Sequence, residues 1–384
     1  MVGLYGRSYG RNIMRYVGRM GQICGIKLVS LEQGMERGVR AAHVRTGTGF
    51  AFMVLIDRGM DISSAEYKGA ALGWRSQTGD VGPQYFEPMG KGWLRGFFGG
   101  LLATCGLTYA GAPCVDQGEE LGLHGRVSYI PAESVQTKGE WVQDDYIMSI
   151  EGRVRETSVF GPNLVLNRKI ETGLGESGIR IMDSVLNEGW RDEPFMILYH
   201  FNIGFPVLDD GSRFVSTSMK YVPRDEEAWK GHEQFGIFQA PTKSFLEKVY
   251  FHDVKVDHDG FAYAGIVNQN FDGGEGIGVA IKYRKSQLNR LIEWKMMGEG
   301  EYVVGIEPAN CLVLGRDKER RSGTLQFLRP GERRDVELEV NVLTNGDQIA
   351  AFEKKVTEVT GGSKPSLVRS VEDFVKETRA MGST

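Results

Sequence analysis

The stretch Val336-Glu-Leu-Glu-Val-Asn-Val-Leu343 alternates apolar and polar side chains along its whole length. Successive side chains of a strand point to opposite sides, so the apolar residues at 336, 338, 340 and 342 share one face. Strands with one apolar and one polar face are typical of antiparallel sheets that bury one side and expose the other. The stretch therefore predicts a strand of such a sheet.

Short runs of the same kind occur on the N-terminal side of this stretch, separated by turn residues. Glycine, which suits tight turns and bulges, makes up 52 of the 384 residues. Many strands with few helical patterns indicate a sandwich or barrel. The expected strands cover residues 41–46, 50–56, 145–154, 164–171, 178–187, 195–202, 276–283, 301–306, 323–328 and 334–343.

No linker or break in composition divides the chain, so we expect one large β domain over residues 31–345. Residues 1–30 form an N-terminal arm whose segment 11–20 is basic with mixed apolar positions. We interpret that segment as a short surface helix or arm, with a partner-binding or membrane-surface helix as the alternative. Residues 346–384 form a C-terminal extension, which ends in a helix at 370–378 with Ser370 and Asp373 in a capping arrangement.

The formal net charge is −4, from 46 basic and 50 acidic residues. This balance argues against a nucleic-acid partner, which needs a concentrated basic face. No apolar run approaches the roughly 18 residues needed to span a membrane, and no secretory signal is recognisable. We therefore expect a cytoplasmic protein without a membrane partner, and a homodimer stays open. Four cysteines, at 24, 105, 114 and 311, match no zinc or redox motif and are expected as buried thiols.

Two histidines and one glutamate occupy constrained positions. His124 lies between glycines in Leu121-Gly-Leu-His-Gly-Arg, and His200 lies near the end of an apolar strand in Leu198-Tyr-His-Phe-Asn. Glu307 follows another apolar strand and precedes Pro308. Strand ends often hold reactive groups, and burial there would raise the pKa of a carboxyl and suit it to general-base work. Structural roles for all three residues are the alternative.

Several further side chains are candidates for substrate binding. Arg58, in Asp57-Arg-Gly-Met-Asp, either forms a plain turn or presents guanidinium donors to hydroxyls or an anion. Arg95 lies among aromatic residues and glycines that form either core or a stacking platform for a sugar ring, and the pair Trp294 and Lys295 carries the same two interpretations. Asn202 and Arg126 lie close in sequence to the two histidines.

Other chemistries lack their motifs in this sequence. No nucleotide-binding glycine loop, no G-x-S-x-G elbow and no zinc signature occurs. The segment Phe251-His-Asp-Val-Lys-Val-Asp-His-Asp-Gly could supply metal ligands from His252, Asp253, Asp257, His258 and Asp259. Its polar residues and final glycine fit a hairpin or edge turn better, so we expect no metal site and no cofactor.

The order of these motifs resembles the aldose 1-epimerase (galactose mutarotase-like) superfamily, and more closely a bacterial branch with a domain of unknown function. The motifs that carry the resemblance are Asp57-Arg-Gly-Met-Asp, Phe97-Phe-Gly-Gly-Leu-Leu-Ala-Thr-Cys-Gly-Leu, Leu123-His-Gly-Arg, His200-Phe-Asn, Gly305-Ile-Glu-Pro and Leu328-Arg-Pro-Gly-Glu. The resemblance implies a large antiparallel β-supersandwich with a sugar cleft on one face.

The resemblance also implies roles for individual residues. His124 matches a histidine that contacts the substrate, His200 matches the general acid, and Glu307 matches the general base. Arg58 falls where related proteins often place a sugar-contacting arginine. The aspartate motif by which mutarotases hold sugar hydroxyls is not found here, although Asp253, Asp257 and Asp259 lie in the right interval. Galactose is therefore not implied as the substrate.

The expected reaction is the interconversion of sugar anomers without a metal or cofactor. A base takes the proton of the anomeric hydroxyl, and an acid protonates the ring oxygen. Two alternatives stay open. Arg58, Arg95 and Arg126 suggest an isomerase, epimerase or lyase acting on an acidic or modified sugar. The other alternative is a sugar-binding protein without catalytic activity.

Overall fold

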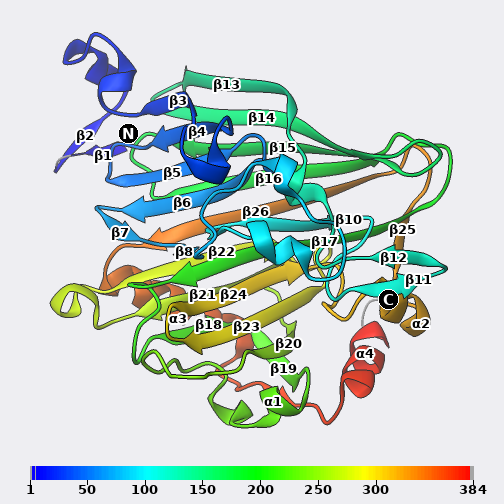
Figure 1. Cartoon of the computed structure of the whole chain (residues 1–384). Helices are drawn as coiled ribbons and strands as arrows, with labels where there is room; N and C mark the ends of the chain where they lie inside the picture. Colours follow the sequence, from blue (N-terminus) through cyan, green and yellow to red (C-terminus); the bar gives the residue numbers. More distant parts are fainter. Residues whose placement is uncertain (1, 5, 381–384) are drawn as a thin grey trace.

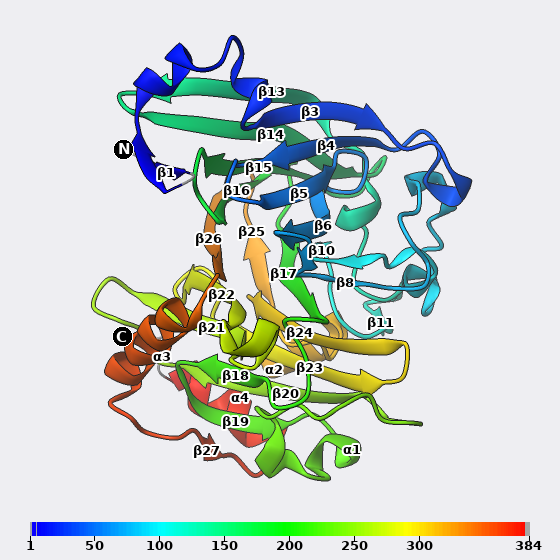
Figure 2. The ribbon, with the colours of Figure 1, turned by 90° about the vertical axis from the view of Figure 1, so that its left-hand side faces the viewer.

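Two large antiparallel sheets form most of the molecule, and Figures 1 and 2 show their strands from two sides. The computed structural model describes residues 2–4 and 6–380. The first sheet has the order β10 (Ala103–Leu107), β17 (Glu193–Gly204), β24 (Glu301–Ala309), β23 (Arg290–Gly298), β20 (Lys248–Val254), β19 (Ser218–Pro223) and β27 (Ser366–Leu367), with β25 (Gln326–Leu328) beside β17. We call it the site sheet. Only its last pair, β19 with β27, is parallel.

The second sheet contains the alternating stretch at 336–343. Its order is β13 (Glu133–Val142), β14 (Asp145–Thr157), β15 (Asn163–Gly173), β16 (Gly178–Asn187), β26 (Arg333–Leu343), β22 (Ile277–Arg284), β21 (Phe261–Asn268) and β18 (Arg213–Ser216). The apolar side chains of β26 are buried in the main core, while Glu339 on the other face pairs with Lys282 of β22 at 2.9 Å. The predicted burial of one face is confirmed.

A third large sheet and three two-stranded sheets complete the strands. The five-stranded sheet runs β3 (Gly25–Ser30), β4 (Arg40–Arg45), β5 (Phe50–Leu55), β6 (Asp61–Tyr67) and β7 (Ala70–Ala71). The two-stranded pairs are β1 (Val2–Leu4) with β2 (Arg7–Tyr9), β8 (Trp74–Arg75) with β9 (Gly99–Gly100), and β11 (Cys114–Asp116) with β12 (Glu119–Leu121). One continuous core of buried side chains joins all three large sheets, from Val44 through Ile181 to Val304. The all-β prediction is confirmed.

All ten predicted strands correspond to observed ones, with differences at their ends. The strand expected at 323–328 begins only at Gln326, because Gly323 ends the helix α2 (Arg316–Ser322) with a left-handed backbone at φ 64°. The predicted helix at 11–20 is replaced by two 3₁₀ helices, η1 (Arg11–Arg15) and η2 (Met20–Gln22). Gly18 lies between them, and glycine disfavours a continuous helix.

Three further α-helices pack on the sheets: α1 (Glu226–Trp229) against β19 and β20, α3 (Gly346–Thr360) over β18, β22 and β26 of the second sheet, and α4 (Val371–Ala380) against β19. The four cysteines are free thiols, three of them buried and Cys114 half-buried. Across residues 2–4 and 6–380, no helix combines the length and the apolar character needed to cross a bilayer.

The predicted helix at 370–378 is α4, and its capping arrangement is present. The Ser370 hydroxyl accepts a hydrogen bond from the Asp373 backbone N–H at 3.1 Å and lies 2.8 Å from the Asp373 carboxylate. Phe374 is fully buried and anchors the helix. We expect Ser370→Ala to lower the free energy of unfolding by about 1 kcal/mol, the usual cost of losing such a cap. Urea denaturation measures this, and an unchanged midpoint would contradict it.

Candidate functional site

A cavity of about 760 Å³ lies over the site sheet, and aromatic, aliphatic and polar side chains line it together. Strands β17, β24 and β23 supply His200, Glu307 and Trp294, and loops supply the remaining walls. A concave, largely apolar space with a few convergent polar groups is the usual form of a small-molecule site. The aromatic members of its lining are Trp74, Trp93, Phe97, Phe245 and Trp294.

His200 and Glu307 face each other across two neighbouring strands. Phe201 pairs with Ile306 in the register of β17 and β24, which places His200 opposite Glu307. The His200 Nε2 atom lies 3.2 Å from Glu307 Oε1, and both side chains are almost fully buried, at 6% and 2% exposure. Residues 107 positions apart in the sequence thus form one buried acid–base pair.

Both residues lie within their strands rather than after them. β17 continues to Gly204 and β24 continues through Pro308 to Ala309, so the expectation that His200 and Glu307 stand at strand ends is wrong. Pro308 lies where the pairing of β24 with β17 is interrupted between Ile306 and Ala309, and a residue without a backbone N–H is tolerated at such a gap. The cavity is built over the faces of the strands, where alternate side chains point into it.

A tightly held loop presents His124. Its backbone has a left-handed φ of 58°, and its N–H and carbonyl oxygen bond Gly111 and Gly106. A Cβ at Gly125 would lie 2.3 Å from the Gly106 carbonyl oxygen, so a larger residue there would force the loop away. The close approach expected from the flanking glycines is therefore present. It brings the His124 ring to 5.8 Å from the His200 ring, centroid to centroid.

Burial decides the charge of the three groups. It lowers the pKa of His200 to about 3, with repulsion from His124 adding to the effect. It lowers the pKa of His124 to about 4. Burial, aided by the nearby Glu247 carboxylate, raises the pKa of Glu307 well above its ordinary value. Burial therefore favours the neutral forms of both groups, which keeps the proton on the Glu307 carboxyl and opposes a second proton on the His200 imidazole.

Neighbouring residues 294 and 295 separate onto opposite faces of β23. Trp294 lines the cavity, and its ring centroid lies 5.4 Å from that of His200. Lys295 points away and donates hydrogen bonds to the carbonyl oxygens of Gln234 and Ile237. Lys295 therefore does not reach a ligand in this cavity, because strand side chains alternate.

Arg58 holds the wall of the cavity from behind. Its guanidinium donates to the carbonyl oxygens of Ser128, Val81 and Gly96 at 2.6, 2.5 and 3.0 Å and stacks on the Tyr129 ring. With 1% exposure and no place in the cavity lining, it cannot contact a sugar there. The predicted contact is wrong because the donors of Arg58 are engaged by backbone.

The other proposed binding residues also lie outside the cavity lining. Arg95 is exposed and pairs with Glu87 at 3.1 Å, although the aromatic residues around it, Trp93 and Phe97, do line the cavity. Arg126 is exposed on the surface over the Phe86 ring. Asn202 is buried beneath His200, where its Nδ2 donates to the backbone oxygens of Gly99 and His200.

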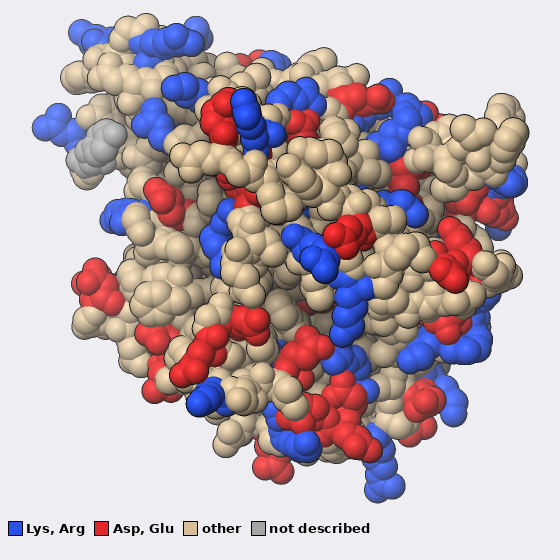
Figure 3. All heavy atoms as spheres, in the orientation of Figure 1, with Lys and Arg blue, Asp and Glu red and all other residues tan. Residues whose placement is uncertain are grey.

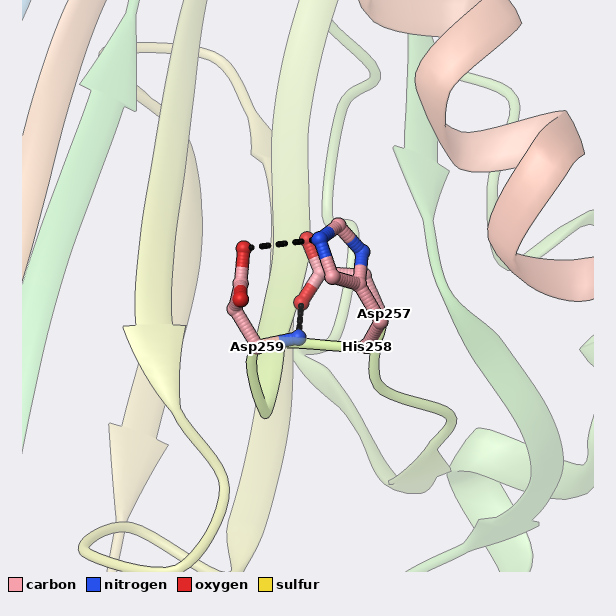
Figure 4. Close-up of side chains that lie close together, drawn as sticks. All are labelled: Asp257, His258 and Asp259. Atoms are coloured by element: carbon pink, nitrogen blue, oxygen red, sulfur yellow. Dashed lines mark hydrogen bonds and ion pairs between the residues drawn. The ribbon is translucent and has the colours of Figure 1, made fainter.

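The segment 251–260 ends β20 and then turns at residues 257–260 into β21 of the second sheet. The expected turn is therefore present, but it is not a hairpin, because β20 and β21 do not pair with each other. Asp257 Oδ1 accepts hydrogen bonds from the backbone N–H groups of Asp259 and Phe261, while its Oδ2 accepts from the Tyr263 hydroxyl at 2.6 Å and pairs with Lys355 at 3.0 Å. Figure 4 shows His258 beside Asp257 and Asp259 at this turn. Both Asp257 oxygens are thus already used by the protein, and His258 and Asp259 are exposed.

A model of a domain of unknown function, DUF4432, matches residues 36–342. The chain belongs to this family. No curated protein matches the sequence.

Solved structures place this DUF4432 protein among galactose mutarotase-like folds. A candidate aldose 1-epimerase from Klebsiella pneumoniae subsp. pneumoniae is 26% identical, with 91% of this chain and 93% of that chain covered and a TM-score of 0.86. A galactose mutarotase-like protein from Clostridium acetobutylicum is 13% identical over 84% and 99%, with a TM-score of 0.56. A galactose 1-epimerase from Lactobacillus acidophilus is 12% identical over 84% and 99%, with a TM-score of 0.54. The superfamily resemblance is confirmed for the fold.

The DUF4432 chain places further polar residues in the cavity that sequence reasoning missed. Glu247 accepts a hydrogen bond from the Trp294 indole at 2.8 Å and another from Arg224 at 3.1 Å. Lys91 and Glu301 also line the space. Glu247 and Arg224 lie at the two ends of the segment between β19 and β20, with no motif to mark them. Only the pairing of β20 with β23 brings them to Trp294.

Proposed function

We propose that this protein is an aldose 1-epimerase-like isomerase that interconverts the anomers of a free sugar. The observation that carries the proposal is the buried His200–Glu307 pair at 3.2 Å on the wall of a 760 Å³ cavity. His200 Nδ1, His124 Nδ1 and Glu307 Oε1 have no hydrogen-bond partner among the described residues. Buried polar atoms are normally satisfied, so a polar ligand that supplies these partners fits the site.

A neutral sugar is the proposed substrate class. The arginines that suggested an acidic sugar, Arg58, Arg95 and Arg126, are absent from the cavity lining. Arg224, which is present, already pairs with Glu247 and Asp225. The two acidic residues Glu247 and Glu301 balance the cations Arg224 and Lys91. The aromatic walls suit the C–H faces of a sugar ring, and the polar groups suit its hydroxyls.

Ring opening requires one proton to leave the anomeric hydroxyl and one to reach the ring oxygen. In our proposal Glu307 takes the first proton and His200 delivers the second while the C1–ring oxygen bond breaks. The open-chain aldehyde then turns about its C1–C2 bond, and the same steps in reverse close the ring on the other face. The net proton count is unchanged, so one proton on the pair is enough for a complete cycle.

The bound sugar must shift the proton of the pair from Glu307 to His200 before this step. Hydrogen bonds donated by sugar hydroxyls favour a carboxylate, and the ring oxygen accepts a hydrogen bond from a protonated imidazole. Asn202 also favours the charged form of His200 and opposes the lowering of its pKa by burial. In our proposal His124 makes a further polar contact with the sugar, close to its ring oxygen and anomeric hydroxyl.

The pH dependence of kcat/KM tests the proton count of the pair. Because kcat/KM reports the free enzyme, its active form carries one proton on the pair. Because the pKa of Glu307 is raised above its ordinary value of 4.5, Glu307 keeps its proton as the pH rises past 4.5. Because the pKa of His200 is about 3, His200 takes up no second proton above pH 3. We therefore expect kcat/KM to fall on the alkaline side and to show no acid limb near 4.5. An acid limb there, after subtraction of spontaneous exchange, would contradict the assignment.

Gly305 is the position where a single added carbon disturbs the pair. A Cβ there would lie 2.5 Å from Glu307 Oε1 and 3.1 Å from His200 Cε1. We expect Gly305→Ala to displace the carboxyl and to lower the exchange rate by about 10- to 100-fold, because reacting groups tolerate little misplacement. Exchange spectroscopy measures the rate, and a melting temperature close to the parent value shows that the fold remains. Parent-like exchange would contradict the geometry.

A panel of neutral aldoses tests the proposed activity itself. Polarimetry or NMR exchange should show anomer interconversion above the spontaneous rate for at least one neutral aldose, with uronates and phosphosugars slower. Thermal stabilisation by a sugar without faster exchange would instead indicate a binding protein and would refute the catalytic proposal.

A further inference from the structure

The N-terminal arm concentrates positive charge that the rest of the chain lacks. Residues 1–31 contain five basic side chains and no acidic one, whereas the following 353 residues contain 41 basic and 50 acidic ones. The arm therefore carries +5 and the remainder −9. In Figure 3 blue Lys and Arg side chains gather at the upper left, where Figure 1 places the N-terminal segment.

Four of the basic side chains at this end meet around one concavity. A pocket of about 330 Å³ is lined by Arg19, Lys27, His43 and Arg45, together with Gly21, Gly25 and Ile26, and no acidic residue lines it. Lys27 of β3 lies directly opposite His43 of β4, and Gly25 lies opposite Arg45. These pairings place the cations on one face of the five-stranded sheet, and none of them lines the sugar cavity.

These cations have no counter-ion in the protein. Within residues 2–4 and 6–380, neither Arg19, Lys27 nor Arg45 forms an ion pair, although many other basic residues of the chain do. Arg45 uses one of its five donors, on the Gly21 carbonyl oxygen at 2.9 Å. Arg45 and Lys27 both act to lower the pKa of His43, after burial, while Glu66 opposes them. Cations therefore line the pocket without an acidic side chain among them, and Glu66 acts on His43 from outside the lining.

We propose that this pocket binds a small phosphorylated molecule through its phosphate group, with Arg19, Lys27 and Arg45 as the contacting side chains. Several convergent cations fit an anion of charge −2 or more better than a single carboxylate. Guanidinium groups bind phosphate oxygens in a bidentate way. The pocket is concave and small, which suits a single phosphate-bearing group better than a nucleic-acid strand.

Binding of inorganic pyrophosphate to the full chain tests this site. We expect calorimetry to show saturable binding, and NMR to show a rise in the pKa of His43 when the anion is present. The double variant Arg19→Ala/Arg45→Ala should weaken pyrophosphate binding about tenfold or more, while Lys364→Ala, an exposed lysine outside the pocket, should bind as the parent does. Anomer exchange should be unchanged in both variants, because the pocket and the cavity share no lining residue.

Two results would overturn the proposal. Parent-like binding by the double variant would place the anion elsewhere. Binding to phosphatidylglycerol vesicles without any response to pyrophosphate would indicate that the basic arm is attracted to a charged surface and that the pocket itself binds nothing. The exposed apolar side chains Met14, Tyr16 and Leu28 would then contact that surface.

Discussion

Glu307→Gln should lose about 10²- to 10⁴-fold of the catalysed anomer exchange, the usual contribution of a general acid or base. Glutamine has the same shape, but it cannot take up or release the proton that the reaction moves. The fold should be unaffected, because burial raises the pKa of the Glu307 carboxyl and so favours its neutral form, which glutamine resembles. Polarimetry or NMR exchange measures the rate, and thermal denaturation checks the fold.

The chain offers a matched control for this variant. Glu293 is fully buried on β23, the strand next to β24, and its Oε2 lies 3.3 Å from His252 Nε2. It resembles Glu307 in burial and in its histidine partner, but it is absent from the cavity lining. We expect Glu293→Gln to keep the parent exchange rate. Equal losses in both variants would show that burial of a carboxyl, and not its position in the cavity, explains the effect.

His200→Ala should also abolish catalysed exchange, by about 10²- to 10⁴-fold, because the ring oxygen then has no proton donor. The matched control is His252→Ala, since His252 is similarly buried but lies against Phe214, Tyr221 and Phe235 outside the cavity. That variant is expected to lose stability and to retain exchange. Near-parent rates in His200→Ala would remove His200 from the mechanism.

The double variant Glu307→Gln/His200→Ala distinguishes a coupled pair from two independent catalysts. Groups that act as one unit give strongly non-additive losses. Because both groups act in the same ring-opening step, 3.2 Å apart, either single variant is expected to disable the whole proton transfer. We therefore expect the double variant to be about as slow as each single one. A loss near the product of the two single losses would indicate separate roles.

The charge of the candidate site follows from burial, which no sequence motif reports. His200 and Glu307 each have an ordinary pKa in water, and the resemblance implied an acid and a base at these positions. Their common burial favours the neutral form of both, lowering the pKa of His200 and raising the pKa of Glu307. In our proposal, the bound sugar therefore drives the transfer of a proton to His200.

Sequence alone determined the strand pattern and the superfamily, and it predicted three residues, His124, His200 and Glu307, that the structure places around one cavity. Alternation in a strand such as Val336–Leu343 depends only on neighbours along the chain, and it correctly predicted which face of β26 is buried. The glycines beside His124 likewise indicated a close backbone approach that the structure contains. Such signals depend on neighbouring residues alone, so they can be recognised in a single sequence.

Only the tertiary structure decided which side chains line the cavity. In the sequence, Trp294 and Lys295 are both candidates for substrate binding. In the structure, only Trp294 faces the cavity. Arg58 matched a family position but holds three backbone carbonyl oxygens instead. Glu247 and Arg224 line the cavity, although no sequence motif marks either residue. The physical reason is that strand register and facing are set by pairing with distant strands, and a shift of one residue would reverse every one of these faces.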